Sequence, residues 1–253
     1  MAITIDGTNG LTTDNGALKL DTDTLVVDET NNTVGIGTSS PSTSHRLTLD
    51  KPTNYGGIEF KQAGTRVGQI IQDGVGNLYV DANTNNGGGS LHLRNYYSDS
   101  LVIDPSGYLT KPNQPAFLAK MSSDQTLVDG SAETITFDTE VYDVGSNFNT
   151  STYQFTAPVG GKYVFSYGIR IDVITSGASY YRPQLYISNQ SFYDIFDPVG
   201  YDSSTSYQSF HMSLTANMDA GDIARVMVRQ QGGTISHLDA SSGYSWFSGY
   251  LLG

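Results

Sequence analysis

The chain lacks cysteine and is poor in charged residues, above all in basic ones. No cysteine occurs among its 253 residues, which excludes disulfides, thiol catalysis and zinc–thiolate sites. Lys and Arg number 13 against 25 Asp and Glu, which gives a net charge of −12. Because the sequence has no cluster of Lys or Arg to supply a basic face, we expect no nucleic-acid partner and no docking on anionic lipid.

Long hydrophobic runs are also missing. No stretch approaches the roughly 18–20 apolar residues of a membrane-spanning helix, so we expect no membrane insertion. The first ten residues, MAITIDGTNG, have neither a basic start nor an apolar core. This start is unlike a signal peptide, and it predicts synthesis in the cytoplasm without one.

The abundant residue types favour β-structure. The chain has 28 Gly and 17 Tyr, and Ser, Thr and Asn are frequent, a composition that favours turns and short strands over helices. In residues 163–173 every second residue is large and apolar: Tyr163, Phe165, Tyr167, Ile169, Ile171 and Val173. Side chains on a strand alternate between its faces, so this pattern predicts one long strand with a single buried face.

Residues 1–44 consist of short extended pieces separated by turns such as Asp14-Asn15-Gly16. Lys19 is the one basic residue in this segment, against six acidic ones. Large apolar residues are too few for one copy to bury a core, whereas several copies wound together would bury one. We therefore interpret residues 1–44 as a β attachment segment of an oligomer.

Residues 45–112 continue in the same way, with pieces such as HRLTLD, GGIEFKQ and GNLYVDA that end at Gly, Asn or Asp. The stretch LVVDETNNTVGI echoes LVIDPSGYLT as strand, Asp, turn, strand. Rung-like repetition of this kind predicts a short intertwined β shaft, and an ordinary small β domain is the alternative. After a linker at 113–115, residues 113–253 form the predicted head.

Signatures of catalysis are absent from the sequence. The four His residues are scattered without HExxH spacing, and no G-x-S-x-G stretch occurs. Gly160-Gly161-Lys162 is followed by Tyr163 in place of the Ser or Thr of a phosphate-binding loop. Asp194 and Asp197 would suit a glycosidase carboxylate pair, which keeps a surface-glycan hydrolase open as an alternative. The main prediction is a protein that is not an enzyme.

The most distinctive patch is residues 177–210, which holds nine aromatic residues among Ser, Asn and Asp. Tyr beside small polar residues is the composition of a recognition loop, and aromatic rings also stack on sugars. An interface between subunits is the alternative. The predicted binding residues are Tyr180, Tyr181, Arg182, Tyr193, Phe196, Asp197, Tyr201 and Asp202.

Calcium is a further candidate ligand, although no cofactor is required by this interpretation. Five acidic residues fall in predicted loops: Asp143, Asp194, Asp197, Asp202 and Asp239. Their spacing does not follow the EF-hand pattern, and solvated turn residues are the alternative. The sequence therefore assigns no set of calcium ligands.

The head resembles the complement-1q-type globular domain, a relative of the tumour necrosis factor jelly roll. Three stretches carry the resemblance in the right order: Phe148 followed by FTAPVGGKYVFSY, then Leu214 followed by AGD and IARVMVR, and the terminal SWFSGYLL. The resemblance runs from about Pro115 to Gly253. It implies a ten-stranded jelly roll, a homotrimer, binding at loops or inter-subunit grooves, calcium near the trimer apex and no catalysis.

A second resemblance lies near the N-terminus. The stretch LVVDETNNTVGIGTSSP is similar to a piece common in phage tail fibres, where it precedes a shaft or a chaperone module. Together the two resemblances suggest a non-catalytic, trimeric receptor-binding fibre located in the virion. Its N-terminal segment would attach to tail or baseplate proteins, and its head would bind a glycan or protein of the host surface. A capsid-decorating or baseplate fibre that binds no receptor is the alternative.

Overall fold

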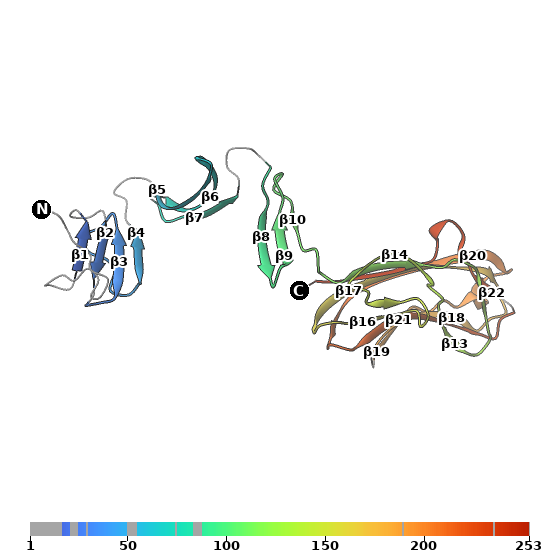
Figure 1. Cartoon of the computed structure of the whole chain (residues 1–253). Coiled ribbons are helices and arrows are strands. Elements are labelled where there is room, and N and C mark those ends of the chain that lie inside the picture. Colours follow the sequence, from blue (N-terminus) through green and yellow to red (C-terminus); the bar gives the residue numbers. More distant parts are fainter. Residues whose placement is uncertain are drawn as a thin grey trace, which may run out of the picture. The chain divides into compact units, whose positions relative to one another are not determined.

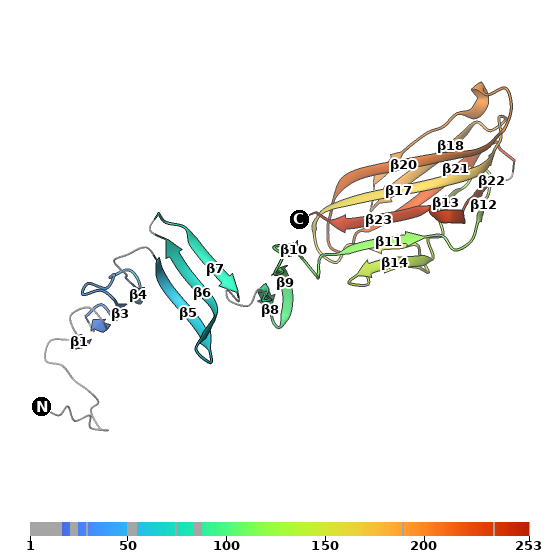
Figure 2. The same cartoon turned by 90° about the horizontal axis from the view of Figure 1, so that it is seen from above.

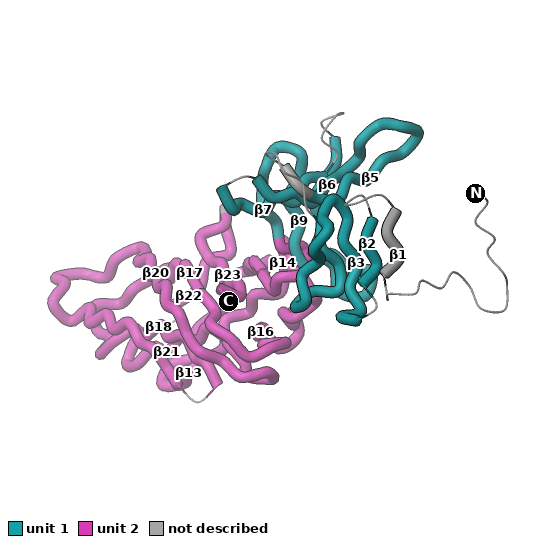
Figure 3. The backbone as a smooth tube through the Cα atoms, turned by 90° about the vertical axis from the view of Figure 1, so that its left-hand side faces the viewer, with its two compact units in different colours: residues 1–110 teal, residues 111–253 magenta. Residues whose placement is uncertain are grey.

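The structure is a computed structural model that describes residues 17–20, 25–28, 30–49, 55–73, 75–82, 88–188, 190–234 and 236–252. Two compact units divide the chain, Met1–Thr110 and Lys111–Gly253 (Figure 3). Strands dominate both units, which confirms the predicted all-β class. The finer division at 44/45 and 112/113 stays a prediction. No helix in the described ranges has the length and apolar character needed to cross a membrane.

The first unit contains three small sheets (Figure 1). Strands β1 (Ala17–Leu20), β2 (Leu25–Asp28), β3 (Thr33–Ile36) and β4 (Leu47–Leu49) form the first sheet, in which only the β3–β4 pair is parallel. Strands β5 (Tyr55–Gln62), β6 (Thr65–Asp73) and β7 (Leu78–Ala82) form an antiparallel meander. Strands β8 (Leu91–Asn95), β9 (Ser98–Ile103) and β10 (Leu109–Thr110) form the third sheet.

An aspartate organises one turn in each of these sheets. The Oδ1 atoms of Asp28, Asp73 and Asp104 accept backbone N–H groups from two residues of the turn that follows each of them. A left-handed residue then reverses the chain, Asn32 (φ 52°) in the first turn and Gly107 (φ 87°) in the third. The echo between LVVDETNNTVGI and LVIDPSGYLT thus corresponds to a shared turn geometry.

The sheets of the first unit bury very little apolar surface. Among the described residues of this unit, Val26 is the one buried hydrophobic side chain. Exposed large apolar side chains occur in all three sheets: Ile36, Leu47, Leu49, Ile58, Phe60, Val67, Ile70, Leu78, Tyr79, Val80, Leu93 and Leu109. A single copy of these sheets therefore has no hydrophobic core of the usual kind.

The second unit, the head, is a sandwich of a seven-stranded and a six-stranded sheet, seen as two layers in Figures 1 and 2. The β17 sheet contains β11 (Ala116–Lys120), β12 (Gln125–Leu127), β14 (Thr139–Val144), β17 (Gly161–Ile174), β20 (Thr205–Met218), β22 (Ser236–Leu238) and β23 (Trp246–Leu251). The β21 sheet contains β13 (Ala132–Thr134), β15 (Phe148–Asn149), β16 (Gln154–Thr156), β18 (Tyr180–Ile187), β19 (Gln190–Tyr193) and β21 (Ile223–Gln231). This arrangement confirms the predicted jelly roll, with short edge pieces added to its strands.

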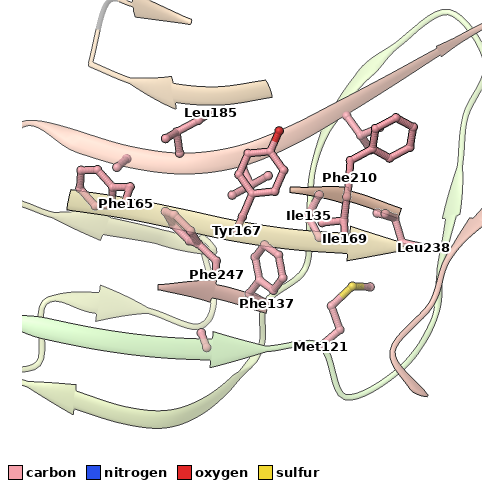
Figure 4. Close-up of a cluster of buried hydrophobic side chains, with 14 of the residues drawn as sticks. Met121, Ile135, Phe137, Phe165, Tyr167, Ile169, Leu185, Phe210, Leu238 and Phe247 are labelled. Carbon is pink, nitrogen blue, oxygen red and sulfur yellow. The ribbon is translucent and has the colours of Figure 1, made fainter. Parts of the chain in front are cut away.

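The core lies between these two sheets and is centred on β17. Tyr163, Phe165, Tyr167, Ile169 and Ile171 are all fully buried, as the alternation predicts. Figure 4 shows Phe165, Tyr167 and Ile169 on β17 among side chains from other elements, including Leu185 and Phe247. Aromatic rings pack closely here, since the ring of Phe117 lies 4.8 Å from that of Phe148 and 5.0 Å from that of Phe155.

The predicted burial of Val173 is wrong. Its side chain is 46% exposed, and Ile174 takes the buried position instead. The backbone of Val173 is left-handed (φ 62°), and it is skipped between the pairs Asp172↔Tyr207 and Ile174↔Thr205. The register of the β17–β20 pair is the same on both sides of Val173, so the left-handed backbone alone moves the buried position by one residue at the end of β17.

Candidate functional site

Strands β18 and β21 turn a row of arginine and tyrosine side chains to the outside of the β21 sheet. On both strands the positions alternate between partly exposed and buried, except that Gln184 of β18 is buried on the outer side. Arg182 pairs directly with Arg229, and Tyr186 pairs with Arg225. Tyr193 of β19 lies opposite Gln184 on the neighbouring strand. We call the set Tyr180, Arg182, Tyr186, Tyr193, Arg225 and Arg229 the arginine face.

Tyrosine rings hold two of these guanidinium groups by cation–π contacts. The Cζ atom of Arg182 lies 4.8 Å from the ring centroid of Tyr193 and 5.9 Å from that of Tyr180. The Cζ atom of Arg225 lies 4.9 Å from the centroid of Tyr186. The third group, that of Arg229, donates from Nη2 to Oε1 of Gln231 at 2.7 Å.

These arginines are not neutralised within the described chain. The Nε atoms of Arg182, Arg225 and Arg229 are buried and have no hydrogen-bond partner. Within the described residues, no carboxylate oxygen comes within 4.0 Å of a nitrogen of these three side chains. The face therefore presents three positive charges with no acidic partner among the described residues, although the sequence as a whole is acidic.

The loop after β19 holds the other predicted binding residues. The Oδ1 atom of Asp197 accepts the N–H of Val199 at 2.9 Å and so caps the 3-10 helix η1 (Pro198–Gly200). The ring of Phe196 contacts those of Tyr201 at 5.6 Å and Phe210 at 5.9 Å. Asp202 is exposed, and the ring of Tyr201 is half exposed.

Tyr181 supports this loop from inside the sandwich. It is fully buried, and its backbone exchanges hydrogen bonds of 2.8 and 2.9 Å with Phe196. Its hydroxyl lies 2.9 Å from Oγ of Ser236. Tyr181 is thus a core residue with no surface to offer a ligand, unlike its neighbours Tyr180 and Arg182.

The structure divides the predicted binding residues into two groups. Tyr180, Arg182 and Tyr193 belong to the arginine face, whereas Phe196, Asp197, Tyr201 and Asp202 belong to the loop around η1. Sequence reasoning missed Arg225 and Arg229 as members of a site. The alternation of IARVMVR showed a two-faced strand, but only the register with β18 places Arg229 opposite Arg182.

The outer side of the β17 sheet is also aromatic, but its arginine is paired. Arg170 forms ion pairs with Asp172 at 3.0 Å and with the buried Asp239. Its Cζ atom lies 5.2 Å from the ring centroid of Tyr207 and 3.9 Å from that of Tyr244. We call Tyr207, Trp246 and Tyr250, with Tyr244 and His211, the aromatic face.

Gly168 allows two side chains of the aromatic face to lie close to β17. A Cβ atom at this position would lie 2.6 Å from Nε1 of Trp246 and 2.9 Å from Cδ2 of His211. Both residues are direct strand partners of Gly168, one on each side. The absence of a side chain therefore lets Trp246 and His211 fold over the strand.

The acidic residues considered for calcium are engaged separately. Asp143 accepts the N–H of Phe148 at 2.8 Å, Asp197 caps η1, and Asp239 accepts the N–H of Ser241 at 2.6 Å in addition to its ion pair. Across the described ranges, no three His, Asp or Glu side chains gather in a metal-binding group.

Burial raises the pKa of the Tyr167 hydroxyl, and the nearby charge of Asp194 raises this pKa further.

The head is a two-sheet jelly roll of the kind used by non-catalytic binding modules. The family model of the C1q domain matches residues 116–252, and the chain belongs to this family. Domains of this family are non-catalytic binding modules that usually form homotrimers. None of the curated proteins compared with the chain matches it.

Similar folds occur among solved structures. The globular domain of zebrafish complement 1qA protein is 16% identical, covers 55% of this chain and 98% of its own, and has a TM-score of 0.40. Murine APRIL at pH 5.0 is 12% identical, covers 55% of this chain and 99% of its own, and also has a TM-score of 0.40.

Proposed function

We propose that the chain is the subunit of a parallel homotrimeric virion fibre, a phage tail-fibre-like receptor-binding protein. Its head would recognise a ligand of the host cell surface, in the first instance a glycan, without catalysing a reaction. The N-terminal segment would attach to tail or baseplate proteins, and the protein would be located in the virion. Family membership supports the non-catalytic binding role of the head.

One observation carries the fibre interpretation, namely that the described residues of the first unit form no hydrophobic core. Its three described sheets expose large apolar side chains and bury one, Val26. Burial of apolar surface of this kind contributes about 25 cal/mol of stabilising free energy for each Å² removed from water. In a trimer, the equivalent sheets of two further copies would lie against these apolar faces. A threefold axis would bury all of them in one assembly. The similarity of residues 25–41 to tail-fibre sequences also supports a fibre.

The head offers two outer faces for contacts between copies, and charge distinguishes them. The aromatic face is rich in rings, and its Arg170 is already neutralised by Asp172 and Asp239. Packing the arginine face around an axis would bring unpaired like charges together and remove them from water, at high cost. We therefore assign the aromatic face to the trimer and leave the arginine face and the η1 loop outside for the ligand.

Three copies of a weak site on one rigid head would bind through avidity. Linked sites gain a high effective concentration, so no single contact needs to be strong. The proposed contact residues are Tyr180, Arg182, Tyr193, Phe196, Asp197, Tyr201 and Asp202, with Tyr181 beneath them as a support.

Competition for host cells tests the proposed function. Purified protein should block adsorption of virions that carry the same fibre. The variant Tyr193→Ala/Tyr201→Ala should lose most of this effect, because both rings are half exposed and would contact the ligand. Tyr108→Ala, which removes an exposed ring from the first unit, should compete as the unchanged protein does. Absence of competition by the intact trimer would favour a structural fibre that binds no receptor.

A further inference from the structure

We propose that the arginine face binds an acidic polysaccharide through its carboxylate, sulfate or phosphate groups. The proposal rests on the binding role given to the head above, and it adds the chemical class of the ligand. The residues that would contact the anions are Arg182, Arg225 and Arg229.

The distribution of charge in the head is the first argument. The head has four arginines, and three of them lie on this one sheet face. The fourth, Arg170, has two carboxylate partners. Within the described residues the other three have none, although acidic residues outnumber basic ones in the chain by 25 to 13. An external anion would supply the missing partner.

The rigidity of the arginines is the second argument. Their Nε atoms are buried without hydrogen bonds, and rings of Tyr193 and Tyr186 lie against the guanidinium groups of Arg182 and Arg225. A side chain held in this way loses little conformational freedom when it binds a ligand. The planar fork of a guanidinium matches the oxygens of a carboxylate, sulfate or phosphate group in a bidentate arrangement.

The spacing of the charges favours a polymer. Arg182 and Arg229 lie side by side across the β18–β21 pair. Arg225 lies four residues further along β21, which corresponds to about 13 Å on an extended strand. Two levels of positive charge, with tyrosine rings between and beside them, suit a chain of sugar rings that carries acidic groups at intervals.

Peptides and nucleic acids fit this surface less well. Strands β18 and β21 are hydrogen-bonded on both sides, to each other and to β19, β13 and β16, so the face offers no free edge to an added strand. Double-stranded DNA carries one charge for about every 1.7 Å of its axis. The acidic surroundings of the head would repel so dense a charge more strongly than the sparser charge of a polysaccharide.

Binding of defined polymers to the full chain tests the proposal. The probes are polygalacturonate, dextran sulfate, a poly(glycerol phosphate), neutral dextran, poly-glutamate and duplex DNA, at low and at physiological salt. We expect binding to at least one of the three acidic carbohydrate-type polymers, weakened by salt, and none to neutral dextran. The three acidic arms distinguish carboxylate from sulfate and phosphate.

Matched variants locate the binding. Arg182→Gln/Arg229→Gln should weaken binding by about tenfold or more for each arginine, because hydrogen bonds between charged groups are lost. Lys111→Gln removes an exposed positive charge that lies outside the strands of both sheets, and it should leave affinity within about twofold. Arg182→Lys/Arg229→Lys should bind at an intermediate level, which separates loss of the fork from loss of charge.

Several outcomes would overturn the proposal. These are no binding to any acidic polysaccharide, equal binding by the Arg182→Gln/Arg229→Gln variant, and tighter binding to poly-glutamate or DNA than to the polysaccharides. A variant that loses its native mass by light scattering would identify the arginine face as a contact between copies instead. Competition for cells without polysaccharide binding would sink this inference and leave the proposed function standing, and the reverse result would do the opposite.

Discussion

At the scale of single residues, Gly249 shows how closely the core is packed. It lies in β23, and a Cβ atom there would be 2.5 Å from Cδ1 of Phe165 and 2.9 Å from Cε1 of Phe117. Gly249→Ala should lower the free energy of unfolding of the head by about 1–3 kcal/mol, because the rings have no space to move. Urea denaturation measures this change. Gly177→Ala is the control, since no atom lies within 4 Å of its Cβ position, and an equal loss in both variants would contradict the packing argument.

A second residue-scale prediction concerns the hairpin between β8 and β9. Tyr96 and Tyr97 form its turn with φ angles of 45° and 65°, and their side chains are 91% and 90% exposed. Turns of this kind favour Asn-Gly, because other residues are strained at positive φ. Tyr96→Asn/Tyr97→Gly should stabilise the hairpin by about 1–2 kcal/mol.

Hydrogen exchange of the amides in β8 and β9 measures the local stability of this hairpin. Protection should rise in the Asn-Gly variant and stay unchanged in Tyr108→Asn, which alters an exposed tyrosine outside this turn. A fall in protection would mean that the packing of the two rings, 5.5 Å apart, outweighs the backbone strain.

Residue patterns predicted burial well wherever the backbone was regular. The alternation through Tyr163, Phe165 and Ile171 identified the core face of β17. It failed at Val173, because a left-handed residue is not visible in a pattern of side-chain polarity. Tyr181 was predicted as a binding residue for a similar reason. An aromatic patch read from sequence alone does not separate rings that face inward from those that face outward.

At the scale of elements, the ion pair between β17 and the segment after β22 stabilises the head. Asp239 is 3% exposed, so removal of Arg170 would leave a buried carboxylate without its cation. Arg170→Met should cost about 3–5 kcal/mol in the free energy of unfolding. Arg170→Met/Asp239→Asn should recover part of this loss, because it also removes the buried charge. Equal stability of the two variants in urea would show that the unpaired carboxylate of Asp239 is not the source of the loss.

The turn after β6 should respond to acid. Hydrogen bonds from the side chain and then the backbone of Asn77 lower the pKa of Asp73 from 3.8 to about 2, against a smaller opposing effect of burial. Because the folded pKa lies below the ordinary value, the carboxylate stabilises this turn above about pH 4, and the stabilisation is lost as pH falls toward 2.

Carboxyl NMR shifts measure this titration directly. Asn77→Ala should raise the pKa of Asp73 toward its ordinary value, since the main donor is removed. Asn31→Ala should leave it unchanged, because Asn31 bonds to Asp28. A normal pKa for Asp73 in the unchanged protein would contradict the described turn.

Strands and turns were easier to predict from the sequence than the pairing of one strand with another. Strand and turn signals are local, so the strands and the aspartate turns of the first unit followed from short stretches of sequence. The pairing of Arg182 with Arg229 joins residues of β18 and β21, with β19 and β20 lying between those strands in the sequence. No local pattern contains this pairing, which is why the sequence appeared to have no basic cluster.

At the scale of the whole molecule, the predicted trimer has a direct measurement. Light scattering should give three times the chain mass of 27.3 kDa for the full protein. A truncated chain that begins at Lys111 should also be trimeric if the aromatic face joins the heads. A monomeric full chain would contradict the proposed fibre, and a trimeric full chain with a monomeric head would place the assembly in the first unit.

The head also sets a condition on its own synthesis. Strand β23 inserts between β11 and β17, so that Gly249 pairs with both Phe117 and Phe165. The edge of β11 that faces β23 therefore stays unpaired during synthesis until β23 emerges, although its other edge can pair with β14. Chains released early would leave the facing edges of β11 and β17 open to strands from other molecules. Premature termination in this region should thus yield aggregates or degraded chains, so that only complete subunits enter an assembly.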